Sequence, residues 1–318
     1  MSWVRIPPGP PCRPGSVHIT DQEAIRFVVE RPQSVDAFLE RAGDFLARHE
    51  AENNLLFGIC SSLRHDPTIY PDPRFAVVSG TSSRPDGPDG RAAEGPVVAA
   101  ALQTPPHRLV LALPDTIEAI EFLVDGLAAE HLPGVVGPSD AAQRFARRWT
   151  SRTGQSIRAG MAERTFRLRT VRHQRPAPGH MRVARPSDRR LLEAWLRAFA
   201  AEALGETFEN AAEAAGRWIS GPGRTMYLWD HDDRTVAMCG AGGQTPNGIR
   251  VGPVYTPTPE RGRGYATGLV AACSQAQLDA GHEFVFLFTD LANPTSNRIY
   301  ESIGYERVID VDQYDFIA

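Results

Sequence analysis

Two arginines and two glycines alternate near the C-terminal end of the sequence, at Arg261, Gly262, Arg263 and Gly264. Glycine lets a backbone approach a ligand closely, and arginine offers charge-assisted, often bidentate hydrogen bonds to phosphates. Apolar residues recur at helical spacing from Ala266 onward, so this turn lies where a helix begins. The first amides of a helix have no partner within it and carry part of a positive charge. These features indicate a phosphate-binding turn, although the same residues also fit a helix start beside two solvated arginines.

The elements around this turn predict a β-α-β unit. Residues 249–256 are rich in β-branched and aromatic side chains, and the prolines Pro257 and Pro259 end this strand because they cannot donate to a ladder. A helix is predicted over 262–280, and the continuous apolar run at 284–288 is typical of a strand covered on both faces. The two strands should therefore be parallel.

Two motifs here resemble those of a known family. Arg261, Gly264 and Ala266 fit the pattern Arg/Gln-x-x-Gly-x-Gly/Ala, and Asn293 to Tyr305 read Asn-Pro-x-Ser-Asn-x-x-Tyr-x-x-x-Gly-Tyr. Both resemble the GCN5-related N-acetyltransferase (GNAT) family. The resemblance covers roughly residues 181–318 and is faint before them. It implies an α/β protein built of tandem acyl-CoA N-acyltransferase (GNAT) folds, in which a mixed, mostly antiparallel sheet with a central parallel strand pair is flanked by helices.

The resemblance also implies which residues hold acetyl-CoA. The turn would bind the pyrophosphate, and the backbone of the preceding strand would bind the pantetheine arm and polarise the thioester carbonyl. Gly252-Pro253 suits a bulge that parts this strand from its parallel neighbour. Tyr300 matches the family's general acid, which protonates the departing thiolate. The implied cofactor-binding residues are Val254, Tyr255, Thr256, Arg261, Gly262, Arg263, Gly264, Tyr265, Ala266 and Asn293.

Some of these residues also have purely structural interpretations. Asn293 followed by Pro294 is typical of a helix N-cap with proline in the first turn. Tyr300 lies on an apolar helix face, where a tyrosine is most often a core aromatic. The sequence does not identify the general base. Asp290, Glu202 and Glu206 are candidates, although a carboxylate in such a position is more often a solvated surface residue than a base. His282 is discounted because it precedes the buried strand, and water-relayed deprotonation would need no single base.

The length of 318 residues suits two domains. A Pro-rich, disordered leader is expected over 1–18, a degenerate GNAT-like domain over 19–174 and an acetyltransferase domain over 180–318. Both halves have the same predicted order of helices and strands, which indicates a weak internal duplication. The turn at 113–116 of the first half has neither glycine nor arginine, so only the second half should bind a nucleotide-like cofactor. The chain should close with a hairpin of residues 305–311 and 314–317.

The amino-acid composition limits the classes of function and of binding partner. The net charge of −4 gives no argument for nucleic acid or an anionic membrane, and no apolar run reaches transmembrane length. The four cysteines are scattered, so neither a disulfide framework nor a metal site is expected. We therefore expect a cytoplasmic protein whose partner is a small-molecule or peptide amine, and a homodimer is possible.

The function that these observations predict is N-acetyl transfer from acetyl-CoA to an amine by direct attack. The alternative is an acyl-CoA-binding regulatory or scaffold protein without turnover. A second alternative is an interaction protein whose arginine turn binds another polyphosphate. Nothing in the sequence identifies the acceptor.

Overall fold

The computed structural model describes residues 26–81, 95–172, 177–205 and 207–318. The predicted leader, much of the loop at 81–95, the linker at 175–179 and Glu206 therefore lie wholly or partly outside the described residues. No helix in the described ranges combines the length and the apolar character needed to cross a bilayer.

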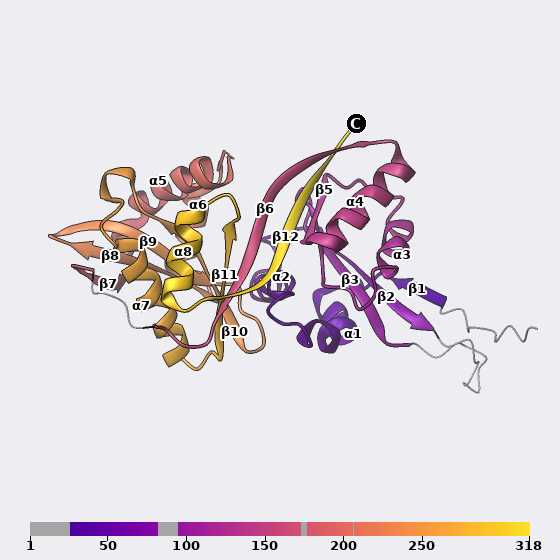
Figure 1. Ribbon diagram of the computed structural model, residues 1–318, viewed down its shortest axis with the longest axis horizontal. Coiled ribbons are helices and arrows are strands. Elements are labelled where there is room, and N and C mark those ends of the chain that lie inside the picture. Colours follow the sequence, from indigo (N-terminus) through magenta and orange to yellow (C-terminus); the bar gives the residue numbers. More distant parts are fainter. Residues whose placement is uncertain (1–25, 82–94, 173–176, 206) are drawn as a thin grey trace, which may run out of the picture.

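The described strands form one sheet that runs through both halves of the chain (Figure 1). Its order is β1-β2-β3-β4-β5-β12-β6-β11-β10-β9-β8-β7. In the first half the strands are β1 (Arg26–Glu30), β2 (Arg74–Thr81), β3 (Val97–Gln103), β4 (Leu109–Leu111), β5 (Gly134–Pro138) and β6 (Ser156–Leu168). In the second half they are β7 (His180–Val183), β8 (Arg224–His231), β9 (Arg234–Gly242), β10 (Gly248–Tyr255), β11 (Phe284–Asp290) and β12 (Glu306–Ile317).

Helices cover both faces of this sheet (Figure 1). The first half contains α1 (Val35–Ala47), α2 (Asn54–His65), α3 (Ala119–Gly126) and α4 (Ser139–Thr153), and the second contains α5 (Arg189–Phe199), α6 (Ala211–Ser220), α7 (Tyr265–Asp279) and α8 (Pro294–Ile303). One core of the second half lies under α7 and α8, and another lies under α5 and α6. The first half repeats this arrangement with α3 and α4 on one face and α1 and α2 on the other.

The sheet order is symmetric about the pair β6 and β12. Each half has five strands on its own side of this pair, and each has a parallel pair next to the centre, β4 with β5 and β10 with β11. The predicted mixed sheet with a parallel pair is confirmed. The symmetry also supports an internal duplication, while the degenerate first copy and the domain boundaries stay predictions.

The two central strands are exchanged between the halves. β12, from the end of the chain, pairs with both β5 and β6 of the first half, while β6 pairs with β11 of the second half. The predicted closing hairpin is therefore wrong: residues 306–317 form one strand with register shifts. The shifts interrupt the alternation of the sequence pattern, and the true partners of β12 are distant in sequence.

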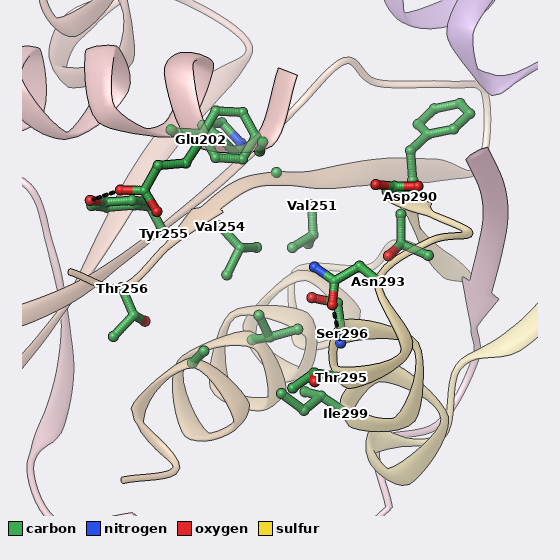
Figure 2. Close-up of a pocket in the computed structure, with 18 of the residues that line it drawn as sticks. Glu202, Val251, Val254, Tyr255, Thr256, Asp290, Asn293, Thr295, Ser296 and Ile299 are labelled. Atoms are coloured by element: carbon green, nitrogen blue, oxygen red, sulfur yellow. Dashed lines mark hydrogen bonds between the residues drawn. The ribbon is translucent and has the colours of Figure 1, made fainter. Parts of the chain in front are cut away.

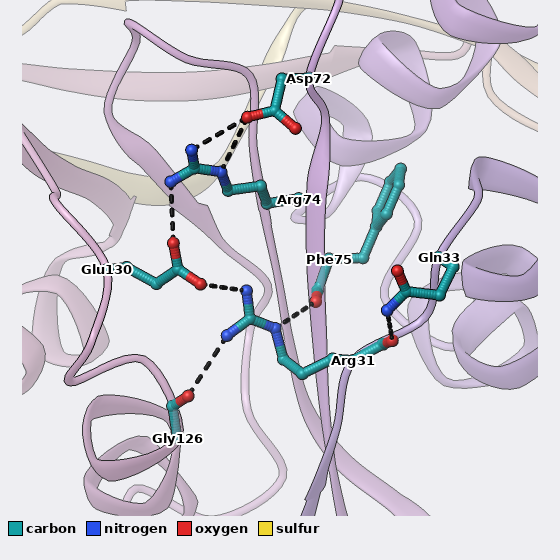
Figure 3. A network of polar contacts seen from close by, with 7 residues as sticks. All are labelled: Arg31, Gln33, Asp72, Arg74, Phe75, Gly126 and Glu130. Atoms are coloured by element: carbon teal, nitrogen blue, oxygen red, sulfur yellow. Dashed lines mark hydrogen bonds and ion pairs between the residues drawn. The ribbon is translucent and has the colours of Figure 1, made fainter.

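A network of ion pairs braces the first half (Figure 3). The Glu130 carboxylate accepts hydrogen bonds from Arg31 at 2.8 Å and from Arg74 at 2.8 Å. Arg74 also donates to Asp72, and Arg31 donates to the carbonyl oxygen of Phe75 at 3.0 Å. Every charge in this network has a partner within the chain, so it serves the fold.

Candidate active site

A cavity of 1120 Å³ opens where β10 and β11 part. The two strands pair in parallel from Gly248 with Phe284 to Arg250 with Phe286. Beyond Arg250 and Phe286, the described residues of these two strands are no longer paired with each other. On its other side β10 shifts its register against β9 between Val251 and Val254. The bulge predicted at Gly252-Pro253 is thus confirmed, and it leaves one backbone edge of β10 facing the cavity.

The glycine turn lies at one end of this cavity. Gly262 and Gly264 have φ angles of 75° and 82°, which favour glycine, and Gly264 is the N-cap of α7. A Cβ atom placed on Gly262 would meet no described atom within 4 Å. The turn is therefore open on its outer side, where the first amides of α7 can reach a ligand.

Arg261 is held at the mouth of the cavity by a carboxylate. Its Nε donates to the carbonyl oxygen of Thr256 at 2.8 Å, and its Nη2 forms an ion pair with Glu202. The Tyr255 hydroxyl donates to the other oxygen of Glu202 at 2.9 Å (Figure 2). These two donors lower the pKa of Glu202, whereas burial raises the pKa of Tyr255. Glu202 thus neutralises the guanidinium that was predicted to face a phosphate.

Most of the predicted cofactor-binding residues line the cavity, and Arg263 does not. The Arg263 side chain is 52% exposed and pairs with Glu260 at 3.0 Å, beside Arg234. Tyr265 lines the cavity, but its hydroxyl lies 2.8 Å from His231 Nδ1. The predicted residues in the lining are Val254, Tyr255, Thr256, Arg261, Gly262, Gly264, Tyr265, Ala266 and Asn293.

The α8 side of the cavity carries Asn293 and Tyr300. Asn293 Oδ1 accepts from the Ser296 amide at 3.0 Å, so this residue caps α8 (Figure 2). Tyr300 is 9% exposed and packs against Phe166 and Tyr305, with ring centroids 6.5 and 6.0 Å away. Its hydroxyl makes no hydrogen bond to the described residues, and burial raises its pKa. Tyr300 is therefore both a packed aromatic and a protonated donor at the cavity wall.

Charged side chains from both halves meet at the far end of the cavity. Asp290, a predicted base candidate, lies at the opposite end from Glu202 (Figure 2). Its register partner on β6 is Glu163, which also lines the cavity and belongs to the first half. Gln313 of β12 donates to Glu163 at 2.9 Å. Burial raises the pKa of Glu163, Gln313 and Arg250 oppose that rise, and Asp290 adds to it.

Glu163 was missed by sequence reasoning. In the sequence it is one charged residue in a strand-like stretch with several others. Its importance comes from the pairing of β6 with β11, which joins residues more than 100 positions apart. No local signal near Glu163 indicates that pairing.

Comparisons with known proteins agree with this geometry. Residues 189–305 match the model of the Acetyltransferase (GNAT) family. No curated protein sequence gives a significant match.

Solved structures share the fold over most of the chain. A Drosophila protein has a TM-score of 0.62 at 13% identity, over 92% of this chain and 99% of its own. A GNAT-family acetyltransferase from Colwellia psychrerythraea has a TM-score of 0.53 at 11% identity, over 91% of this chain and 99% of its own. A GCN5-related N-acetyltransferase from Sphaerobacter thermophilus has a TM-score of 0.50 at 18% identity, over 91% and 94%. These likenesses concern the fold, whereas the family model matches the stretch of sequence that supplies most of the cavity lining. The chain therefore carries a domain of the GNAT acetyltransferase family at residues 189–305.

Proposed function

We propose that this protein is an N-acetyltransferase that moves an acetyl group from acetyl-CoA to an amine by direct attack. The observation that supports this most is that one cavity joins three elements of the chemistry. It has an open glycine turn at a helix N-terminus, the free edge of a bulged strand, and a largely buried tyrosine in its lining. The family assignment supports acyl transfer from a CoA thioester in general.

The residues present fit coenzyme A. Gly262 and Gly264 leave space for a diphosphate against the first amides of α7, and Arg261 adds a guanidinium. The backbone edge of β10 after the bulge offers peptide groups to the pantetheine arm, which is itself built of amides. The Thr256 hydroxyl is buried without a partner among the described residues and is a further donor on this path. Acetyl-CoA would supply the acetyl group as an activated thioester.

Two side chains would move the protons. In the proposed step the amine nitrogen bonds to the acetyl carbon and the carbon–sulfur bond breaks. Tyr300 gives its hydroxyl proton to the departing sulfur, and the Glu163 carboxylate takes a proton from the amine, directly or through water. Backbone amides of β10 near the bulge would stabilise the negative charge that develops on the carbonyl oxygen.

The test is calorimetric binding of acetyl-CoA to the full chain, with thiol release measured against a panel of amines. We expect binding, and release that depends on the amine. Arg261→Ala should weaken binding roughly 10- to 100-fold, the value of a charge-assisted hydrogen bond. Arg263→Ala is the matched control, because this neighbouring arginine lies outside the cavity lining.

Two other results would overturn the proposal. Tight binding without release for any amine would favour an acyl-CoA-binding regulatory protein. Competition by ATP as strong as by coenzyme A would favour a polyphosphate-binding interaction protein. The cytoplasmic location, the homodimer and the degenerate first copy stay predictions.

A further inference from the structure

Arg250 is a cationic side chain of the cavity lining for which the described part of the chain offers no counterion within 4.0 Å. It is partly buried and lines the cavity wall, yet it makes no ion pair within 4.0 Å and no hydrogen bond to the described residues. Burial is the main cause that lowers the pKa of Arg250, but an arginine stays charged in proteins. A partly buried charge without a partner is unfavourable, so its presence in a ligand cavity calls for an explanation.

The surrounding residues keep this guanidinium in place. Arg250 lies opposite Gly242 on β9, and Arg224 of β8 lies opposite the same glycine. A Cβ atom on Gly243 would come within 3.2 Å of Arg250 Nη2, so the absence of a side chain there makes room. The guanidinium carbon is 5.9 Å from the centre of the Phe288 ring, which also lines the cavity. Packing of this kind restricts the rotamers of Arg250 before any ligand binds.

The position of Arg250 separates it from the phosphate-binding turn. Five residues of β10 lie between Arg250 and Thr256, which corresponds to roughly 15–20 Å of extended chain. Figure 2 shows Thr256, Val254 and Val251 in succession toward Asp290. A cofactor whose diphosphate lies at Arg261 would place its thioester between the two arginines, so Arg250 faces the acceptor.

The acceptor end of the cavity therefore carries both signs of charge. Glu163 and Asp290 supply carboxylates, and Arg250 supplies the cation. Glu163 raises the pKa of Arg250, so the two lie within electrostatic reach, but they are not within 4.0 Å of each other. Tyr70 and Arg224 are the other titratable groups that act on Arg250, and Arg108 is a further one that acts on Glu163. A ligand with an amine and an anion at its two ends would match both charges.

We propose that the acceptor is a small amine that also carries a carboxylate, as an amino acid does, and that Arg250 binds this carboxylate. The inference rests on the proposed function and names its substrate class. Arginine presents two parallel N–H donors that match a carboxylate, so the contact fixes orientation as well as charge. The amine is then directed toward Glu163.

The experiment compares acceptors that differ only in the anion. Full-length protein is assayed for thiol release with an amino acid, its amide, and an amine of similar size that carries a phosphate. We expect kcat/KM to fall roughly 10- to 100-fold from the amino acid to its amide. Arg250→Gln should lower kcat/KM for the amino acid by a similar factor and remove the preference, and Arg250→Lys should restore part of it.

Controls distinguish carboxylate binding by Arg250 from a purely structural role of this arginine. They also distinguish a failure of this proposal from a failure of the proposed acetyltransferase function. Acetyl-CoA affinity should be unchanged in Arg250→Gln, and the melting temperature without ligand should not fall, because Arg250 makes no ion pair or hydrogen bond to the described residues. Arg307→Gln, at a surface arginine paired with Glu301, should leave the preference intact. Equal rates for acid and amide, or a clear preference for the phosphate, would overturn the carboxylate proposal while acetyl-CoA binding and turnover persist. Loss of acetyl-CoA binding in the wild type would instead overturn the function.

Discussion

At Tyr300, removal of a single oxygen atom can distinguish a role in packing from a role in proton transfer. Tyr300→Phe keeps the ring contacts with Phe166 and Tyr305 and removes the hydroxyl. Because burial raises the pKa of Tyr300, the hydroxyl is protonated at neutral pH and can donate. We expect kcat to fall roughly 100-fold or more, with acetyl-CoA affinity near that of the wild type. Thiol release and calorimetry measure the two quantities, and a parallel loss of both would show that Tyr300 acts through packing.

Glu163 should give activity a pH dependence with a defined sign. Its pKa is raised, so the carboxylate takes up a proton at a higher pH than an ordinary glutamate, whose pKa is about 4.3. We expect kcat/KM to decline on the acidic side as Glu163 is protonated, with a midpoint above that ordinary value. Glu163→Gln should remove this acidic limb and lower kcat/KM at neutral pH.

The matched control for Glu163 is Glu202, a second carboxylate of the cavity lining. Glu202 has a lowered pKa and lies at the opposite end of the cavity, so Glu202→Gln should keep the acidic limb. An acidic limb that survives in Glu163→Gln would assign the proton acceptor elsewhere, to Asp290 or to water.

The segment after α5 lines the cavity at the end where Arg261 lies. A wide helical turn at Ala200–Leu204 carries Glu202, which pairs with Arg261 and accepts from Tyr255. A diphosphate must compete with Glu202 for the same guanidinium. Glu202→Gln should therefore tighten acetyl-CoA binding several-fold, because the glutamine can still accept from Tyr255 but no longer neutralises Arg261.

Calorimetry on the Glu202 variant provides the measurement, and Glu193→Gln on α5 is its control. Glu193 pairs with Arg197 on the same helix, outside the cavity lining. Weaker acetyl-CoA binding in Glu202→Gln would mean that Glu202 orients Arg261 for the ligand instead of competing with it.

Local elements could be predicted from the sequence, and long-range pairings could not. The strand, turn and helix around Gly264 were readable because proline, glycine and helical spacing act over a few residues. Expected and observed limits differ there by only a few positions: the strand is 248–255 instead of 249–256, and α7 is 265–279 instead of 262–280. The partners of β6 and β12 are distant in sequence, so local sequence patterns could predict neither the exchange of these strands nor the position of Glu163 in the cavity.

At the scale of the whole molecule, neither half has a complete sheet of its own. β6 lies between β11 and β12, so each half surrounds a strand that the other supplies. Loop contacts add to this dependence: Glu50, between α1 and α2, accepts hydrogen bonds from Thr245 and from the Asn247 amide at 2.8 Å in the β9–β10 loop. The first half thus supplies strand β6 and the cavity residue Glu163 to the second half. This holds whether or not the first half binds a ligand of its own.

This dependence predicts how fragments of the chain behave. A fragment of residues 177–318 lacks β5 and β6, which leaves one edge of β11 and both edges of β12 without partners. We expect this fragment to aggregate or to lack a cooperative melting transition. A fragment of residues 155–318 retains β6 and should regain a melting transition and measurable acetyl-CoA affinity. Co-expression of 1–172 with 177–318 should give a complex that elutes as one species, because both exchanged strands are then present. Circular dichroism, size exclusion and calorimetry provide the measurements.

Cooperative folding of 177–318 alone, with the acetyl-CoA affinity of the full chain, would show that the exchanged strand is dispensable and that the halves are independent domains.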